Sequence, residues 1–204
     1  IPEDRSQAIE QSVEYIRKYF SLGFLTSPTY DLSRPLSKQT DNNYDSSHFI
    51  WNSNIIKLVT KLGVSDSWMD RVIQGFYGQF KSESRKCTYT LLSRRSYEMG
   101  GTRFHSRGLN EERYVANFVE SEQFVQSGKL VSTYLQIRGS PPMFWRQKAV
   151  TSPAELTRTY EFSQKYFVVH VQRLLDIYGK VDCFNLMSDQ KEGEELLCRT
   201  FEAL

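Results

Sequence analysis

Five arginines in the middle of the chain have the residue type and spacing to hold an anion. They stand among glycines between residues 92 and 145, and they are Arg94, Arg95, Arg103, Arg107 and Arg138, with Gly100, Gly101, Gly108 and Gly139 beside them. Glycine lets backbone N–H groups approach an anion closely, and a guanidinium offers a fixed fork of donors that matches phosphate oxygens. Arginines beside glycines are also common in turns. The residues alone therefore leave open two readings, a phosphate-binding site and a glycine-punctuated antiparallel sheet with a solvated basic rim.

Arg103 and Arg107 are the strongest candidates for anion contact, because they lie four residues apart in a loop opened by two glycines. The alternative is that they pin this loop to acidic residues such as Glu111 or Glu120. Arg138 follows a strand pattern and precedes a glycine, so its guanidinium is expected at a strand end. A functional and a structural role are equally open for it.

Arg94 and Arg95 end a predicted strand on alternate faces, so at most one of them points toward a shared site. A second predicted strand is unusually polar, and its polar residues are Asn117, Glu120, Glu122 and Gln123. The two glutamates fall on one face of that strand and the two amides on the other. Inward carboxylates on a strand usually hold arginines in place. We therefore interpret this strand as support for the arginines rather than as a source of general acid–base catalysis.

The amino-acid composition limits the classes of function that this chain can have. The 26 lysines and arginines are nearly balanced by 24 acidic residues, so no global basic field points to nucleic acid, and anion binding must come from local clustering. The three cysteines contain no C-x2-C pair, and His48, His105 and His170 lack metal-ligand spacing. We therefore expect no metal, no cofactor and no disulfide framework, and a reducing cytosolic location as the default. No apolar run approaches the roughly 20 residues of a membrane-spanning helix.

Hydrophobic periodicity predicts an α/β fold of mixed α+β type, in which a mixed β-sheet is flanked by helices. Helices are expected over residues 4–20, 52–62, 152–178 and 192–204, the third beginning at the capping signal Ser152-Pro153-Ala154-Glu155. This long helix is expected to turn Phe162, Tyr166, Val169 and Leu174 inward. Two β-hairpins are expected, 72–81 with 86–94 and 114–125 with 129–138, and a glycine-rich loop separates them. A mobile loop over 21–48, a short buried strand over 181–187 and core positions for Phe144 and Trp145 complete the prediction.

Several short motifs run through the chain in a fixed order. They are R-R-S at 94–96, G-T-R-F at 101–104, R-G at 107–108, V-A-N-F-V-E-S-E-Q at 115–123, Q-I-R-G-S-P-P at 136–142 and F-W at 144–145. Shorter and less distinctive motifs flank them, namely Y-D-L at 30–32, F-I-W-N at 49–52 and Y-G with N-L between 178 and 186. This order resembles the Sac family of phosphoinositide phosphatases, synaptojanin-type Sac domains most of all. Because the likeness covers nearly the whole chain, it is far more specific than a lone motif.

The resemblance implies a phosphatase that hydrolyses a ring phosphate of a phosphatidylinositol phosphate, such as phosphatidylinositol 4-phosphate. Sac phosphatases use a Cys-x5-Arg-Thr loop, in which a thiolate is the nucleophile. None of Cys87, Cys183 and Cys198 has an arginine at the sixth following position. We therefore expect the loop downstream of Leu204, and the 204-residue chain to be a fragment that is inactive alone. Family anatomy assigns residues 1–66 to the end of the Sac amino-terminal region and 67–204 to the first part of the phosphatase domain.

The resemblance also assigns expected roles. It favours substrate-side phosphate contact for Arg94, Arg103, Arg107 and Arg138, and no metal. The implied partners are a phosphoinositide headgroup and the cytoplasmic surface of a membrane to which the protein binds peripherally, with trafficking or adaptor proteins besides. The alternative is a non-catalytic Sac-like module that binds protein or membrane.

Overall fold

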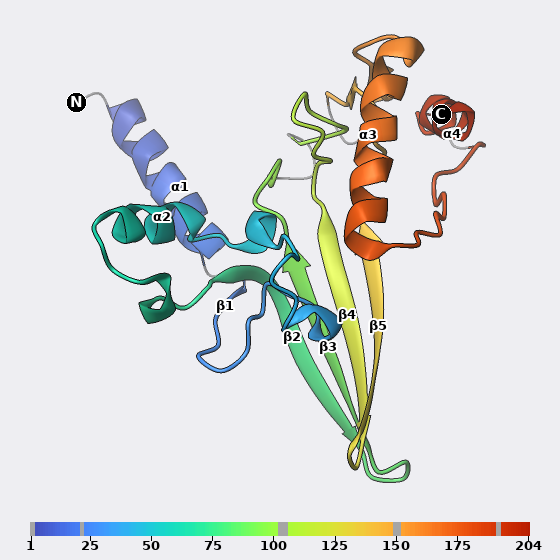
Figure 1. Cartoon of the computed structure of the whole chain (residues 1–204). Coiled ribbons are helices and arrows are strands. Elements are labelled where there is room, and N and C mark those ends of the chain that lie inside the picture. Colours follow the sequence, from blue (N-terminus) through green and yellow to red (C-terminus); the bar gives the residue numbers. More distant parts are fainter. Residues whose placement is uncertain (1–2, 21–22, 102–105, 149–151, 191–192) are drawn as a thin grey trace. The chain divides into compact units, whose positions relative to one another are not determined.

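The computed structural model describes residues 3–20, 23–101, 106–148, 152–190 and 193–204 (Figure 1). Its strands form a five-stranded sheet of order β1-β2-β3-β4-β5 and a separate two-stranded sheet of β6 and β7. The strands are β1 Phe24–Leu25, β2 Ile73–Ser82, β3 Cys87–Arg95, β4 Val119–Ser127, β5 Leu130–Arg138, β6 Trp145–Arg146 and β7 Glu155–Leu156. The helices are α1 Glu3–Phe20, α2 Ser53–Lys61, α3 Tyr160–Tyr178 and α4 Glu195–Ala203, with short 3-10 turns η1 Leu36–Lys38, η2 Ser47–Phe49 and η3 Asp66–Trp68. The mixed α/β class predicted from the sequence is confirmed.

The chain forms two compact units. The first consists of residues 1–40, 49–94 and 121–135, and the second of residues 41–48, 95–120 and 136–204. Strands β3, β4 and β5 contribute residues to both units. The predicted division near residue 66 concerns the anatomy of the family and stays a prediction.

Both predicted hairpins are present. In the first, β2 and β3 are joined at residues 83–86, and the Phe80 and Tyr89 rings face each other with centroids 6.3 Å apart. In the second, β4 and β5 are joined at Gly128, whose φ of 57° costs glycine little. β4 begins at Val119 rather than at the predicted residue 114, because Arg113 and Asn117 have positive φ values of 69° and 55°, which an extended strand does not allow. The two-residue strand β1 was not predicted. It lies inside the segment 21–48, for which a loop was expected, and it pairs antiparallel with β2.

The long helix begins later than its capping signal indicated. α3 starts at Tyr160, and the hydroxyl of its N-cap Thr159 accepts a hydrogen bond from the Phe162 amide. Residues 155–156 are instead strand β7, which pairs with β6. The Thr157 amide continues this pairing by donating to the Phe144 carbonyl at 2.9 Å. The pairing of β7 with β6 therefore prevents a helix from starting at Ser152, in spite of the local capping signal there.

Two further expectations about the second unit were wrong. Residues 181–187 form no strand and are not a buried segment, since Phe184 and Leu186 are 81% and 94% exposed. Val169, predicted to face inward on α3, is 41% exposed. A short apolar run does not distinguish a buried strand from an open segment, because its hydrophobicity says nothing of what lies beside it.

The core of the second unit consists of two apolar clusters. One contains Met143, Trp145, Ala154 and Leu197. The other contains Leu109, Val115 and Phe144, against which the rings of Phe162 and Tyr166 pack. The core positions predicted for Phe144 and Trp145 are confirmed, and they fix the segment that follows β5.

Candidate functional site

Arg94 is a buried cation in the first unit. Its Nη2 lies 2.6 Å from Oε2 of Glu122, and the side chains of the two residues are 0% and 1% exposed. The other carboxylate oxygen of Glu122 accepts a hydrogen bond from the Leu36 amide at 2.9 Å. Burial, aided by the negative charge of Glu122, raises the pKa of nearby Tyr30 to about 12. The ion pair gives Arg94 a structural role, and phosphate contact by Arg94 stays a prediction.

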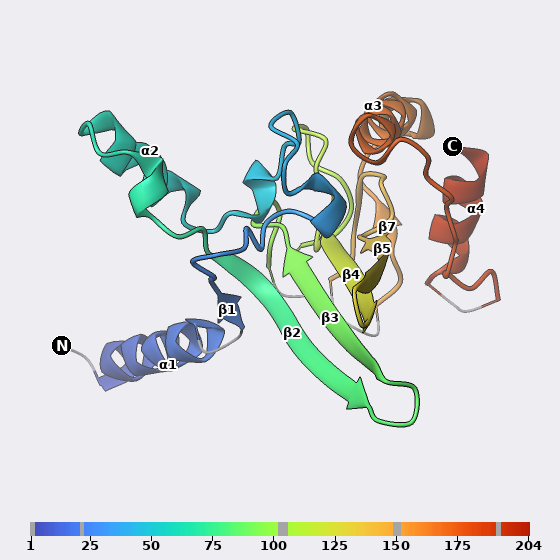
Figure 2. The same ribbon diagram turned by 60° about the horizontal axis from the view of Figure 1, so that its bottom comes forward.

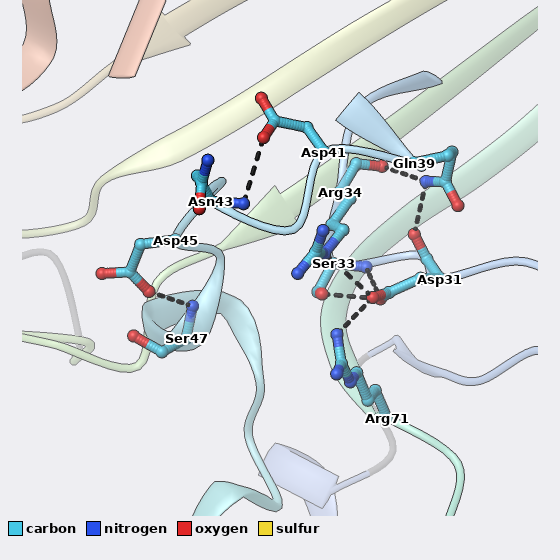
Figure 3. Close-up of polar contacts among 9 residues, drawn as sticks. All are labelled: Asp31, Ser33, Arg34, Gln39, Asp41, Asn43, Asp45, Ser47 and Arg71. Carbon is cyan, nitrogen blue, oxygen red and sulfur yellow. Dashed lines mark hydrogen bonds and ion pairs between the residues drawn. The ribbon is translucent and has the colours of Figure 1, made fainter. Parts of the chain in front are cut away.

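Asp31 organises the loop between β1 and η1 (Figure 3). Its Oδ1 accepts hydrogen bonds from the amide and hydroxyl of Ser33 at 3.0 and 2.6 Å, and its Oδ2 forms ion pairs with Arg34 and Arg71. The Gln39 side chain donates to the carbonyls of Asp31 and Arg34, each at 2.9 Å. Sequence reasoning noted Tyr30-Asp31-Leu32 only as an echo of the family. An aspartate two residues before a serine was the available signal for a side-chain-stabilised turn.

The same kind of turn recurs in the second unit. Figure 3 shows the Asp41 carboxylate accepting from the Asn43 amide and the Asp45 carboxylate accepting from the Ser47 amide, at 3.0 and 2.9 Å. These contacts satisfy backbone donors within the loop that leads into η2.

The end of β3 is tied to the glycine-rich loop. Arg95 donates through Nη2 to the Asn117 side-chain oxygen and to the Gly101 carbonyl. The side-chain Nδ2 of Asn117 in turn donates to the Ser106 carbonyl at 3.4 Å. Asn117 therefore binds Arg95 from the turn before β4, and its supporting role at a phosphate site stays a prediction. Sequence reasoning counted Arg95 among the five arginines that could hold an anion and did not foresee these contacts.

Arg107 and Gly108 pack against the segment that follows β5. The Arg107 guanidinium lies 5.1 Å from the centre of the Trp145 ring, and its Nη2 donates to the Gln147 side chain at 2.6 Å. The Gly108 amide donates to the hydroxyl of Ser140 at 2.8 Å. Gly108 has a φ of 70°, and a Cβ added to it would meet the Met143 carbonyl at 2.4 Å. Only glycine fits there, which explains the R-G pair in physical terms.

Arg138 ends β5 with an exposed side chain. Among the described residues, none forms a hydrogen bond or an ion pair with its side chain. Gly139 and Ser140 follow it, and Ser140 contacts the Arg107-Gly108 turn. The structure thus brings the R-G turn and the R-G-S turn together in the second unit. Arg103, like His105, lies outside the described residues.

Glu120 and Gln123 are placed differently from each other. Glu120 is fully buried, and its carboxylate accepts hydrogen bonds from the hydroxyls of Tyr178 and Tyr44 at 2.6 and 3.2 Å. Burial and the charge of Glu120 raise the pKa of Tyr178 well above its usual value. Gln123 is exposed on β4. The tyrosine contacts of Glu120 could not be foreseen, because Tyr44 and Tyr178 are 76 and 58 residues away from it.

Two buried histidines line a cavity of about 20 Å³ in the second unit, a volume suited to a single water molecule. Burial lowers the pKa of His48 to about 4, and the positive charge of Arg173 acts in the same direction. Burial also lowers the pKa of His170, whose Nδ1 lies 3.2 Å from the Arg113 carbonyl. Arg173 packs over the Tyr114 ring at 4.3 Å. Both pKa shifts favour the neutral imidazole.

Comparison with known proteins assigns the family. The family model described as the SacI homology domain matches residues 3–204. The chain belongs to this family. It is 32% identical to synaptojanin-1 of Rattus norvegicus over 211 residues, which cover 98% of this chain and 13% of that protein. The resemblance found in the motifs is confirmed.

Two fungal proteins are similar as well. Inositol-1,4,5-trisphosphate 5-phosphatase 1 of Schizosaccharomyces pombe is 35% identical over 187 residues, or 83% of this chain and 17% of that protein. Polyphosphatidylinositol phosphatase INP53 of Saccharomyces cerevisiae is 31% identical over 211 residues, or 93% of this chain and 19% of that protein. This SacI homology chain therefore spans less than a fifth of the length of these relatives.

Two structural observations bear on metals and membranes. Among the described residues, no group of three or more histidine, cysteine, aspartate or glutamate side chains could hold a metal ion. No helix in the described part of the chain is long and apolar enough to cross a membrane.

Proposed function

We propose that this chain is part of a phosphoinositide phosphatase, which removes a ring phosphate from a phosphatidylinositol phosphate such as phosphatidylinositol 4-phosphate. The observation that carries the proposal is the similarity over 98% of the chain to a synaptojanin, together with similarity to a protein named as a polyphosphatidylinositol phosphatase. The enzyme works in the cytoplasm at a membrane surface, where trafficking or adaptor proteins are further partners. Residues 1–66 belong to the amino-terminal region of the domain and 67–204 to its phosphatase part.

The chain contributes arginines on the substrate side. Arg138 supports this proposal best, because its exposed guanidinium can form a charge-assisted, bidentate hydrogen bond with phosphate oxygens. Arg107 lies in the neighbouring turn, and Arg103 precedes it by four residues in the sequence. Arginine and backbone donors neutralise the equatorial phosphate oxygens as charge develops, so the chemistry needs no divalent cation.

The nucleophile is a cysteine of the Cys-x5-Arg-Thr type, outside residues 1–204. Its thiolate attacks phosphorus as the bond from phosphorus to the inositol oxygen breaks, and that oxygen takes a proton from a general acid outside residues 1–204. Water then hydrolyses the phosphocysteine, which releases phosphate and restores the thiol. Cys198 does not suit this role: it is buried in α4, and burial raises the pKa of its thiol, whereas a nucleophilic cysteine needs a lowered pKa. Neither Cys87 nor Cys183 has an arginine six residues on.

The test is phosphate release from phosphatidylinositol 4-phosphate by the full-length protein. We expect release that survives EDTA and is abolished by a Cys→Ser change in the Cys-x5-Arg-Thr loop, and no release by residues 1–204 alone. Release that depends on Mg²⁺ would point to a different phosphatase class. No release from any phosphatidylinositol phosphate would favour the non-catalytic module.

A further inference from the structure

Two hairpin turns lie side by side at one end of the sheet in the first unit. The hydroxyls of Ser93 and Ser121 are hydrogen-bonded at 2.7 Å, which aligns β3 with β4. Because β3 leaves the first turn and β4 enters the second, this register brings Cys87 opposite Ser127, and both turns reach the same edge (Figure 1). Figure 2 shows the β2–β3 turn at the end of β2 that lies opposite to β1 and α2.

This end of the sheet is strongly basic. It carries four exposed cations, Lys81, Arg85, Lys86 and Lys129, against the single carboxylate of Glu83. The resulting net charge of +3 exceeds the +2 of the whole chain, so the remainder of the protein is slightly acidic. A nearly neutral molecule thus concentrates positive charge at one place, and a surface attracted to it must be anionic.

Large apolar side chains stand next to these cations. Leu130, at the start of β5, is 78% exposed, and Phe80, at the end of β2, is 66% exposed. Phe76 and Tyr134, farther along the same strands, are 56% and 59% exposed. Exposed apolar side chains that are mixed with lysine and arginine at a protruding turn have the composition of a segment that enters the headgroup layer of a membrane.

We propose that these residues, the basic hairpin end (Lys81, Arg85, Lys86, Lys129, Phe80 and Leu130), dock the protein on an anionic lipid bilayer. The cations contact lipid headgroups, and the ends of Phe80 and Leu130 enter the boundary between headgroups and acyl chains. A convex turn suits a deformable lipid surface better than a protein groove. The inference rests on the proposed function only in its choice of a lipid surface as the partner.

Sedimentation of the full chain with vesicles tests the electrostatic part. The vesicles contain phosphatidylcholine with or without phosphatidylserine, and no phosphoinositide, so the result does not depend on phosphatase activity. We expect binding only with phosphatidylserine. The Arg85→Gln/Lys86→Gln pair should bind roughly 25-fold more weakly, about fivefold for each cation removed near the surface. The matched control Lys57→Gln/Lys61→Gln, on exposed positions of α2, should bind normally.

A second pair of variants tests the apolar part. Leu130 and Leu62 are equally exposed, at 78% and 77%, but Leu62 ends α2. Leu130→Ser should weaken binding to the phosphatidylserine vesicles roughly tenfold, whereas Leu62→Ser should not. Equal effects of the two serine variants, equal effects of the two glutamine pairs, or no binding to phosphatidylserine would overturn the proposal. Phosphate release by the full-length protein from phosphatidylinositol 4-phosphate in detergent micelles would be unaffected in each case, which separates this failure from a failure of the proposed function.

Discussion

Arg94 and Glu122 share an environment from which water is excluded. Each side chain is at most 1% exposed, and the pair is supported by the Leu36 amide. Removing two charges from water is costly, and their attraction at 2.6 Å offsets that cost only while both partners are present. The free energy of unfolding should therefore fall far more when one partner is removed than when both are replaced by apolar side chains.

Glu122→Gln should lower the free energy of unfolding by about 3–5 kcal/mol, because it leaves the guanidinium of Arg94 buried without a counter-charge. Urea denaturation measures the change. Glu195→Gln is the control, since Glu195 forms an ion pair with Arg199 on α4 at the surface, and its loss should cost less than about 1 kcal/mol. Equal losses in the two variants would contradict a buried, tightly coupled pair.

His48 should make stability depend on pH. Its folded-state pKa of about 4 lies below the ordinary value of 6.5, so the unfolded chain binds more protons between these values. The stability from this group is complete above pH 6.5 and is lost as pH falls toward 4, by up to about 1.4 kcal/mol per pH unit. Urea denaturation at pH 7 and pH 5 should show the loss, and His48→Gln should reduce it. An unchanged slope in His48→Gln would assign the acid sensitivity to other groups, such as His170.

Part of the candidate site could be read from residue types. The arginines and glycines marked Arg107-Gly108 and Arg138-Gly139 as candidates for anion contact, and the structure joins these two segments through Ser140, whereas their contact with phosphate stays a prediction. The partners of individual charges could not be read in the same way. Arg94 and Arg95 are adjacent in sequence, yet one is buried against Glu122 and the other is bound by Asn117. Which neighbour a charge meets depends on strand register, and sequence periodicity does not fix register across the long loop between β3 and β4.

At the scale of elements, local signals predicted the hairpins well and the start of α3 poorly. A hairpin is set by a short turn between two alternating runs, so most of its information is local. The start of α3 depends instead on a strand pair between residues 145–146 and 155–156. Ser152-Pro153 and Thr159 both offer N-cap chemistry, and the pairing of β7 with β6 decides between them.

Thr159→Ala should therefore lower the free energy of unfolding by about 1 kcal/mol, since its hydroxyl caps the Phe162 amide. The matched change Ser152→Ala should have an effect within about 0.5 kcal/mol. Thermal or urea unfolding of both variants provides the measurement. A larger loss for Ser152→Ala would mean that the helix begins where the sequence signal placed it.

At the scale of the whole molecule, near-neutral charge is combined with local concentrations of cations. The exposed Arg138 ends β5 in the second unit, while the basic hairpin end carries a net charge of +3 in the first. The family itself could be read from motif order along the whole chain, because a conserved order of many short segments is much rarer than any one of them. The absence of a strand over 181–187 could not be predicted from the sequence. Burial of that segment depends on neighbouring elements, which the local sequence does not describe.

The central claim is that the arginine and glycine turns serve phosphate hydrolysis, and Arg138→Ala in the full-length protein tests it most directly. Its kcat/KM for phosphatidylinositol 4-phosphate should fall roughly ten- to hundredfold, since a charge-assisted contact to phosphate contributes about 1.5–3 kcal/mol. Its unfolding free energy should change by less than about 1 kcal/mol, because the side chain is exposed. Lysine should restore activity only in part, and Arg199→Ala, on the exposed face of α4, should leave it unchanged. Normal activity per folded molecule in Arg138→Ala would contradict the account.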